Sequence, residues 1–394
     1  PATQGISSRQ VRKLVMAAMD SVPDLTEWQD AAWLARQSWP SWSDAMKALH
    51  APETEADLEP QAPARARLAF DELLAHQLAL ARRRRTRQAV AAPRLSPGPA
   101  AEQLLAALPF TLTGAQVRAV AEIRRDLGSG EQMARLLQGD VGSGKTAVAA
   151  LVLADAVDSG FQAALMAPTD ILARQHYERL APLFREAGVD SALLTGRDPA
   201  SVRRPVLEGL ARGSLPIVVG THALFQASVR FSRLGLAVID EQHRFGVRER
   251  QRLLDKGGED GAVHLLTMSA TPIPRTLELT QYGDLEVSRL DEKPPGRKPI
   301  KTAVLPLDRL GEVAVRLKAA VEAGAQAYWI CPLIEESEHI DLAAAEDRAR
   351  DLSKLMGRPV GLVHGRMPGP ERETVMQSFL DGHLPLLVAT TVVE

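Results

Sequence analysis

A glycine-rich stretch with one lysine carries the clearest chemistry in the sequence. It reads Gly139-Asp140-Val141-Gly142-Ser143-Gly144-Lys145-Thr146 and fits the pattern G-x-x-x-x-G-K-[ST]. Glycines let backbone N–H groups converge on a phosphate, the lysine reaches the β- and γ-phosphates, and the threonine hydroxyl can hold Mg2+. An apolar helical run follows at residues 147–157. The stretch therefore predicts a loop whose eight residues all contact a bound nucleotide.

Two adjacent carboxylates, Asp240 and Glu241, follow a second apolar stretch at residues 236–239. Parallel sheets place their ligands at strand ends of this kind. Asp240 can hold the Mg2+ that bridges phosphates, and Glu241 can orient and polarise an attacking water. We therefore expect Lys145, Asp240 and Glu241 to be catalytic, with Thr146 and Asp240 as the Mg2+ ligands.

Residues before the phosphate loop suit the base of the nucleotide. Thr113 is a candidate N-cap of a helix. Gln116 carries both a hydrogen-bond donor and an acceptor, which suits the edge of an adenine. Phe110 is a candidate for stacking on the base. All three are expected to contribute to nucleotide binding.

A third strand end bears small hydroxyl residues. Ser269 and Thr271 follow the apolar run 263–268, and they can hydrogen-bond the acidic strand end and report phosphate state. We assign a coupling role to these two residues, together with Arg275, Gln242 and His243.

Three more apolar strands end in polar loops. The residues are Pro168 and Thr169, then Thr221 and His222, and finally His364 and Arg366. Each pair alone is typical of an ordinary loop, but the set suits contacts with a sugar-phosphate backbone. His222 and His364 are not spaced as metal ligands, so no zinc site is predicted.

Bulk composition narrows the class of protein. The 394 residues are 45% hydrophobic and 24% charged with a net charge of −2, so any nucleic-acid contact must come from local basic patches. A single cysteine, Cys331, excludes an internal disulfide and indicates a reducing compartment. No apolar run reaches the ~20 residues that span a bilayer. Because the chain begins at Pro1 and stops at Glu394 directly after a strand, we expect both ends to be cut.

Periodicity divides the chain into five segments. Residues 1–88 are predicted to be a helical lead-in, 89–100 a linker, 101–290 an α/β domain, 291–299 a second linker, and 300–394 an incomplete second α/β domain. Alternating strands and helices in both domains indicate parallel sheets. The expected strands are 135–138, 163–167, 217–220, 236–239, 263–268, 302–305, 326–332, 360–364 and 386–390. Four tryptophans at positions 28, 33, 39 and 42 favour a small core over a base-stacking surface.

Several longer strings give the chain a family resemblance. They are G-D-V-G-S-G-K-T, V-I-D-E-Q-H-R-F-G-V (238–247), M-S-A-T-P-I-P-R-T-L (268–277), P-P-G-R-K-P (294–299), C-P-L-I-E-E-S-E (331–338) and L-V-H-G-R-M (362–367). With them the chain resembles superfamily 2 helicases and, among these, the bacterial RecG family. Transcription-repair coupling factors share part of the pattern, but they tend to have phenylalanine where Ser143 stands and glutamate where Gln242 stands. The resemblance covers nearly the whole chain.

This resemblance implies two RecA-like P-loop motor domains, the second incomplete, behind a helical segment. It implies an ATP-dependent DNA helicase or translocase that uses ATP and Mg2+ in DNA repair and recombination. The implied substrates are branched DNA, namely stalled forks and Holliday junctions, with R-loops as a further candidate. A single-strand DNA-binding protein as partner and a monomeric state are further implications of the resemblance. No membrane association is expected from the short apolar runs, and a cytoplasmic, nucleoid-associated location is expected.

Two alternatives stay open at this point. One is a double-strand DNA translocase of the coupling-factor type, and the other is an ATP- and DNA-binding chain that does not hydrolyse ATP. The resemblance implies an N-terminal wedge domain before Pro1 and an arginine beyond Glu394 that reaches the γ-phosphate. Such an arginine is worth about 10³–10⁵ in rate, so the chain alone is expected to hydrolyse ATP weakly.

Overall fold

The chain divides into two compact units, residues 1–297 and 298–394. The computed structural model describes residues 7–23, 25–241, 253–270, 285–292, 300–331 and 338–390, with backbone alone at 88, 258–260, 338–344, 369, 370 and 373. The predicted coupling residues Gln242, His243, Thr271 and Arg275 lie outside these ranges.

The first unit begins with helices, as the sequence predicts. They are α1 (Ser8–Met19), α2 (Ala31–Gln37), α3 (Trp42–His50), the short 3-10 helix η1 (Glu55–Leu58) and α4 (Pro63–Gln88). Ser7 caps α1 by accepting a hydrogen bond from the main-chain nitrogen of Gln10. The rings of Trp33, Trp39 and Phe70 pack on one another with centroids 4.7–5.4 Å apart, which confirms the small core for two of the four predicted tryptophans. Trp28 is 55% exposed and does not belong to a buried core.

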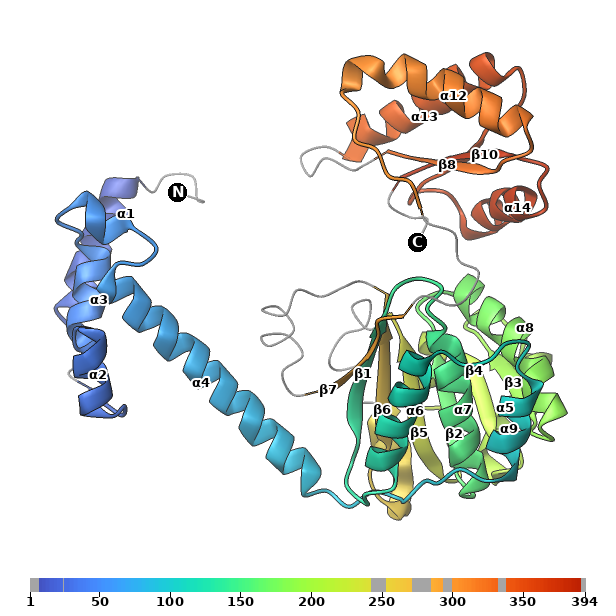
Figure 1. Ribbon diagram of the computed structural model, residues 1–394, viewed down its shortest axis with the longest axis horizontal. Coiled ribbons are helices and arrows are strands. Elements are labelled where there is room, and N and C mark those ends of the chain that lie inside the picture. Colours follow the sequence, from blue (N-terminus) through green and yellow to red (C-terminus); the bar gives the residue numbers. More distant parts are fainter. Residues whose placement is uncertain are drawn as a thin grey trace. The chain divides into compact units, whose positions relative to one another are not determined.

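A seven-stranded parallel sheet follows, in the order β3-β4-β2-β5-β6-β1-β7 (Figure 1). The strands are β1 (Ala134–Gly139), β2 (Gln162–Met166), β3 (Ser191–Leu194), β4 (Ile217–Gly220), β5 (Leu234–Asp240), β6 (His264–Ser269) and β7 (Glu286–Leu290). Its helices are α5 (Pro99–Ala107), α6 (Gly114–Leu127), α7 (Lys145–Asp158), α8 (Asp170–Glu186) and α9 (Ala200–Arg212), with the 3-10 turns η2 (His222–Phe225) and η4 (Asp255–Asp260).

Alternation along the strands divides the core into two layers. Leu137 and Leu165 pack with α5, α6, α7 and α8 on one face of the sheet. Their neighbours Leu136 and Met166 pack with α9 and η2 on the other face. Successive side chains of a strand point to opposite faces, so one strand serves both layers. Ten consecutive residues of α7 are buried, from Ala147 to Ala156, which explains why this helix lacks a polar face.

The strand predictions differ from the structure in three places. β3 and β7 were missed, and residues 302–305 were predicted as a strand but have no regular structure. β7 is an edge strand that carries charged Glu286 and Arg289, so its sequence lacks a continuous apolar run. Val304 is 96% exposed, so its apolar segment does not take part in a core.

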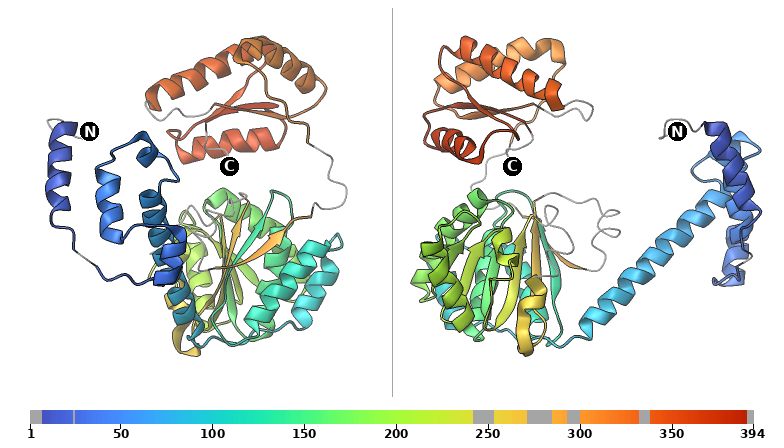
Figure 2. Two further views of the ribbon diagram at one scale, coloured as in Figure 1. Left: turned by 60° about the vertical axis from the view of Figure 1, so that its left-hand side comes forward. Right: turned by 180° about the vertical axis from the view of Figure 1, so that it is seen from behind.

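The second unit contains a three-stranded parallel sheet in the order β8-β10-β9. Its elements are η5 (Leu307–Arg309), α12 (Leu310–Glu322), β8 (Ala327–Ile330), α13 (Glu338–Met356), β9 (Gly361–Val363), α14 (Gly369–Leu380) and β10 (Leu386–Ala389). Helices α12 and α13 cover one face of this sheet and α14 covers the other (Figure 2). The α/β class predicted from sequence is therefore confirmed in both units.

Candidate functional site

The phosphate loop connects the end of β1 to the start of α7, as its sequence pattern requires. Gly142 and Gly144 have φ angles of 76° and 87°, values that L-residues with a Cβ rarely adopt. Gly144 stands directly before the first residue of α7. The N-terminus of this helix therefore points its unpaired N–H groups toward the loop, which is the arrangement that binds phosphate.

Lys145 lies half-buried beside its own loop. Its ammonium donates hydrogen bonds to the main-chain oxygens of Gly139 at 2.6 Å and Asp140 at 3.2 Å. Burial lowers the pKa of Lys145 below 10.5, and the charges of Asp240, Glu241 and Asp140 oppose that shift. The lysine thus shares one electrostatic environment with the carboxylates at the end of β5.

Gln116 links the phosphate loop to helix α6. Thr113 caps that helix, and the side chain of Gln116 completes the capping box by accepting from the Thr113 nitrogen at 2.8 Å. The amide nitrogen of Gln116 donates to the main-chain oxygen of Ser143 at 2.8 Å. The expected N-cap is confirmed. Both ends of the Gln116 amide bond to the protein, so its contact with an adenine edge stays a prediction, as does stacking by Phe110, which is 49% exposed.

The carboxylates at the end of β5 contact two different neighbours. Asp240 is 9% exposed, and its Oδ2 atom lies 2.7 Å from Nε2 of His176 on α8. Glu241 has a φ angle of 50°, which is unusual for a residue with a long side chain. Its Oε1 atom accepts a hydrogen bond from the main-chain nitrogen of Ala270 at 3.3 Å.

The Glu241–Ala270 contact joins the acidic strand end to the end of β6. The sequence predicted a link between these two stretches through the hydroxyls of Ser269 and Thr271. Ser269 is buried at the last position of β6, and a link through its hydroxyl or that of Thr271 stays a prediction. One described link is made by the backbone nitrogen of Ala270. A backbone donor leaves no trace in residue type, which is why the sequence pattern could not identify it.

The predicted DNA-contacting residues of the first unit follow two neighbouring strands. Pro168 is half-buried, and the exposed Thr169 caps α8 by accepting from the Leu172 nitrogen at 3.3 Å. His222 is exposed, whereas Thr221 is fully buried, so only the histidine side chain can reach a ligand at the end of β4. In the second unit, His364 is half-buried and Arg366 is exposed after β9.

Two features of this edge were not found from the sequence. His176 lies in the second turn of α8, and nothing in the sequence pattern pairs it with Asp240. Thr195, Gly196 and Arg197 follow β3 and add a further polar strand end, which was missed because β3 itself was missed. The signal available for the second feature was a short apolar run followed by Thr-Gly.

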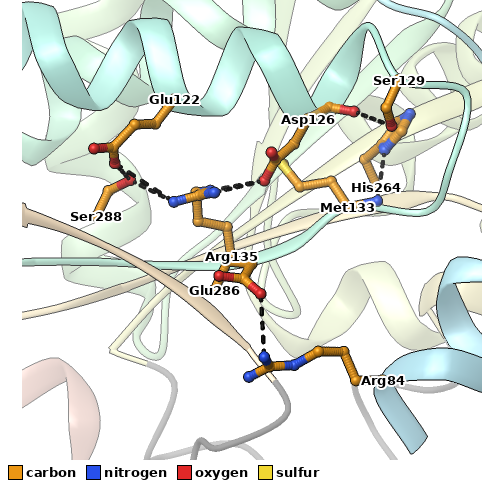
Figure 3. A network of polar contacts seen from close by, with 9 residues as sticks. All are labelled: Arg84, Glu122, Asp126, Ser129, Met133, Arg135, His264, Glu286 and Ser288. Atoms are coloured by element: carbon orange, nitrogen blue, oxygen red, sulfur yellow. Dashed lines mark hydrogen bonds and ion pairs between the residues drawn. The ribbon is translucent and has the colours of Figure 1, made fainter. Parts of the chain in front are cut away.

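A buried polar network holds the other end of the phosphate-loop strand (Figure 3). The guanidinium of Arg135 on β1 bonds Asp126 at 2.8 Å, Ser288 at 2.9 Å and Glu122 at 3.5 Å. Ser288 also donates to Glu122. Because Asp126 and Glu122 belong to α6 and Ser288 to β7, the network fixes β1 between its neighbours.

Other kinds of site are not found within the described ranges. No group of three His, Cys, Asp or Glu side chains there could hold a metal ion unaided. No helix among the described residues is long and apolar enough to cross a bilayer. Mg2+ at Thr146 and Asp240 would accordingly need oxygen ligands from phosphate and water, as is usual for this ion.

Comparison with known protein families identifies helicase segments in both units. Residues 113–280 match the DEAD/DEAH box helicase family, and residues 312–394 match the helicase conserved C-terminal domain. The whole chain is 46% identical to the ATP-dependent DNA helicase RecG of Acidithiobacillus ferridurans, of which it covers 57%. It is 43% identical to the RecG helicase of Thermotoga maritima, of which it covers 50%.

Solved structures agree with these matches. A structure of RecG bound to a three-way DNA junction aligns with the whole chain at a TM-score of 0.78 and 42% identity, and the chain covers 51% of that protein. The DEAD-box helicase Mss116 bound to single-stranded RNA aligns at a TM-score of 0.56 and 16% identity, which shows a shared fold alone. The chain thus spans a little over half the length of the RecG helicases that it resembles.

Proposed function

Because this chain belongs to the RecG family of helicases, we propose that it is an ATP-driven motor that remodels branched DNA. The proposed activities are reversal of stalled forks and migration of Holliday junctions in recombination and repair. The relatives are named as ATP-dependent DNA helicases, and one of them was solved on a three-way junction. A single-strand DNA-binding protein as partner and a monomeric state belong to the same proposal.

In this proposal the phosphate loop binds the triphosphate of ATP. Lys145 neutralises charge on the β- and γ-phosphates, and the backbone N–H groups of residues 139–146 hold the phosphate oxygens. Thr146 and Asp240 offer a hydroxyl and a carboxylate, which are the hard oxygen donors that Mg2+ prefers. Mg2+ bound there would neutralise charge that develops during phosphoryl transfer. Glu241 would orient the attacking water.

One observation supports the nucleotide site most strongly. The phosphate loop follows β1 and the acidic pair ends β5, and only β6 lies between these two strands in the sheet. All three strands are parallel, so their carboxyl ends share one edge. The pKa of Lys145 responds to the charges of Asp240 and Glu241, as expected if these groups face one ligand.

The DNA-contacting part of the proposal rests on the remaining strand ends. Thr169 and His222 are exposed after β2 and β4, on the same edge of the sheet as the nucleotide loop. Hydroxyls, imidazoles and backbone N–H groups of this kind bind phosphate oxygens without reading base sequence. Arg366 of the second unit is proposed to add a cationic contact, and Gln242, His243, Ser269, Thr271 and Arg275 to couple ATP to DNA.

The proposed preference for branched DNA can be tested by comparing the affinity of the chain for DNA molecules of different shapes. Forked, linear duplex and single-stranded DNA of equal length would be titrated at fixed salt with a non-hydrolysable ATP analogue present, and ATP hydrolysis would be followed in parallel. Fixed salt is needed because phosphate contacts dominate such affinities. Tighter binding to the fork is expected. Equal affinity for fork and linear duplex would favour a coupling-factor type of translocase instead, and no binding to any DNA would refute a DNA motor.

A further inference from the structure

The strand order divides one edge of the first sheet, where the carboxyl ends of its parallel strands lie, into two halves. The ends of β1 and β5 carry the nucleotide-site residues, and the end of β6 between them carries the proposed coupling residue Ser269. The ends of β2 and β4 carry the proposed DNA-contacting residues, and β3 lies beyond them. β5 and β2 are direct neighbours in the sheet. The boundary between the two halves therefore lies between Asp240, at the end of β5, and the loop 167–169 that follows β2.

The His176–Asp240 contact crosses this boundary. The imidazole Nε2 atom lies 2.7 Å from Oδ2 of Asp240, and both side chains are 12% exposed. Because a carboxylate can only accept, Nε2 must carry the proton and donate it to the hydrogen bond. With Oδ2 engaged, the carboxylate plane is fixed and its other oxygen has a defined direction.

Helix α8 connects this contact to the proposed DNA surface. Thr169 caps the helix, and His176 lies seven residues further along it, which corresponds to about 10 Å of rise. Ala173, Leu180 and Phe184 are buried, so α8 is packed in the first unit along the length that joins its cap to His176 and beyond. The helix is therefore a continuous connection between Thr169 and the hydrogen bond on Asp240.

We propose that His176 is a positioning residue that ties the Mg2+-binding carboxylate of Asp240 to helix α8, and thereby couples DNA contact at Thr169 to Mg2+-nucleotide affinity. This inference rests on the proposed function, because it takes Asp240 as the metal ligand and Thr169 as a DNA contact. Hydrogen bonds to a metal-binding side chain from a neighbouring residue hold that side chain in place, and their loss weakens metal affinity about 10–100-fold. Linkage requires that DNA and Mg2+-nucleotide strengthen each other's binding by the same factor.

The first test measures how nucleotide binding depends on Mg2+. A fluorescent ATP analogue would be titrated at a series of free Mg2+ concentrations with the wild-type chain, His176→Ala and His176→Gln. His176→Ala is expected to need at least about 5-fold more Mg2+, with unchanged nucleotide affinity in EDTA. His176→Gln, which keeps a donor of similar reach, should recover most of the loss. Glu178→Ala, an exposed change on the same helix, should match the wild type.

The second test measures coupling. Nucleotide affinity would be determined with and without forked DNA, and the ratio should fall toward one in His176→Ala while Glu178→Ala keeps the wild-type ratio. An unchanged Mg2+ requirement in His176→Ala would overturn the inference, as would an equal loss of affinity in EDTA, which indicates a purely structural role. If His176→Ala does not fold, His176→Leu, which fills similar space but has no donor, replaces it, and the same outcomes decide.

Failure of the inference can be told apart from failure of the proposed function. If Lys145→Ala binds the analogue as well as the wild type, the nucleotide site itself is wrong. If Lys145→Ala loses binding while His176→Ala keeps the wild-type Mg2+ requirement, only the role of His176 is wrong.

Discussion

The side-chain amide of Gln116 donates a hydrogen bond to the main-chain oxygen of Ser143 at 2.8 Å and so joins helix α6 to the phosphate loop. The oxygen of the same amide accepts from the Thr113 nitrogen at 2.8 Å. Gln116 is 1% exposed, so water cannot replace either partner. The loop is thus held from a helix that lies 27 residues earlier in the chain.

Replacing this amide by a carboxylate tests the role of that link. Gln116→Glu keeps an acceptor for the Thr113 nitrogen but turns a second oxygen toward the Ser143 oxygen. A buried acceptor left without a donor costs about 1–3 kcal/mol, so nucleotide affinity should fall roughly 10-fold or more.

Gln132→Glu is the matched control, because Gln132 donates to the Val263 oxygen away from the loop. It should lower the free energy of unfolding and leave nucleotide affinity unchanged. Wild-type affinity in Gln116→Glu would contradict this account.

Gly144 is expected to tolerate no side chain. Its φ angle is 87°, and an added Cβ would overlap the Nε2 atom of Gln116. Gly144→Ala should therefore lose both stability and nucleotide binding. Gly188→Ala is the control, since Gly188 has a φ angle of 69° but no atom within 4 Å of its added Cβ. The control should lose about 1–2 kcal/mol of unfolding free energy from backbone strain alone. Equal losses in urea denaturation of the two variants would show that the contact with Gln116 is unimportant.

Arg135 is expected to contribute more to the free energy of unfolding than an exposed arginine does. Its side chain is 9% exposed and contacts Asp126, Glu122 and Ser288 (Figure 3). The carboxylates of Glu122 and Asp126 are 39% and 27% exposed, so water can solvate them when the guanidinium is removed, and the loss should be that of hydrogen bonds to a charged group, about 1.5–3 kcal/mol. Arg135→Ala is expected to lose that amount in chemical denaturation. Arg204→Ala, at an exposed pair with Glu208, should change the unfolding free energy by under about 1 kcal/mol. Similar losses in both variants would contradict the role of burial.

The stability of the first unit should decline in mild acid because of His264. The ring is fully buried, accepts from the Met133 nitrogen at 3.0 Å and donates to the Pro93 oxygen at 2.7 Å. Burial lowers the pKa of His264 below its usual 6.5, although the Pro93 oxygen and the charge of Asp126 oppose the shift. The unfolded chain therefore takes up a proton below pH 6.5 before the folded chain does, and stability falls with falling pH by up to about 1.4 kcal/mol per pH unit.

Denaturation curves between pH 7.5 and 5 would measure this dependence. His264→Gln should be less stable than wild type at pH 7.5 and should lose this part of the slope below pH 6.5. His50→Gln, at an exposed histidine, serves as the control and should keep the wild-type slope. An unchanged slope in His264→Gln would assign the acid sensitivity to other groups.

The sequence predicted those parts of the fold in which a recognisable motif lies beside an apolar strand or a helix cap. The phosphate loop, the apolar strand before Asp240 and the capping threonine at position 113 each depend on local residue types, so they could be identified without a structure. β7 could not, because an edge strand needs only one buried face and alternates charged with buried residues.

The sequence did not predict which residues of different motifs contact one another. His176 and Asp240 are 64 residues apart, and a histidine on an amphipathic helix does not indicate its partner. Gln116 was assigned to a nucleotide base because its amide suits that role, and the sequence could not show that both ends of the amide already bond to protein. Long-range pairing of this kind depends on strand order, which residue patterns do not specify.

The central claim is that residues 139–146 form a working nucleotide site, and the affinity of Lys145→Ala for an ATP analogue tests it most directly. Hydrogen bonds from charged groups contribute about 1.5–3 kcal/mol, so the variant should bind about 10- to 100-fold more weakly with Mg2+ present. Lys256→Ala, at a lysine that bonds the Gln226 and Val229 oxygens, is the matched control and should bind normally. Equal affinity in Lys145→Ala and wild type would contradict the assignment of this loop as the ATP site.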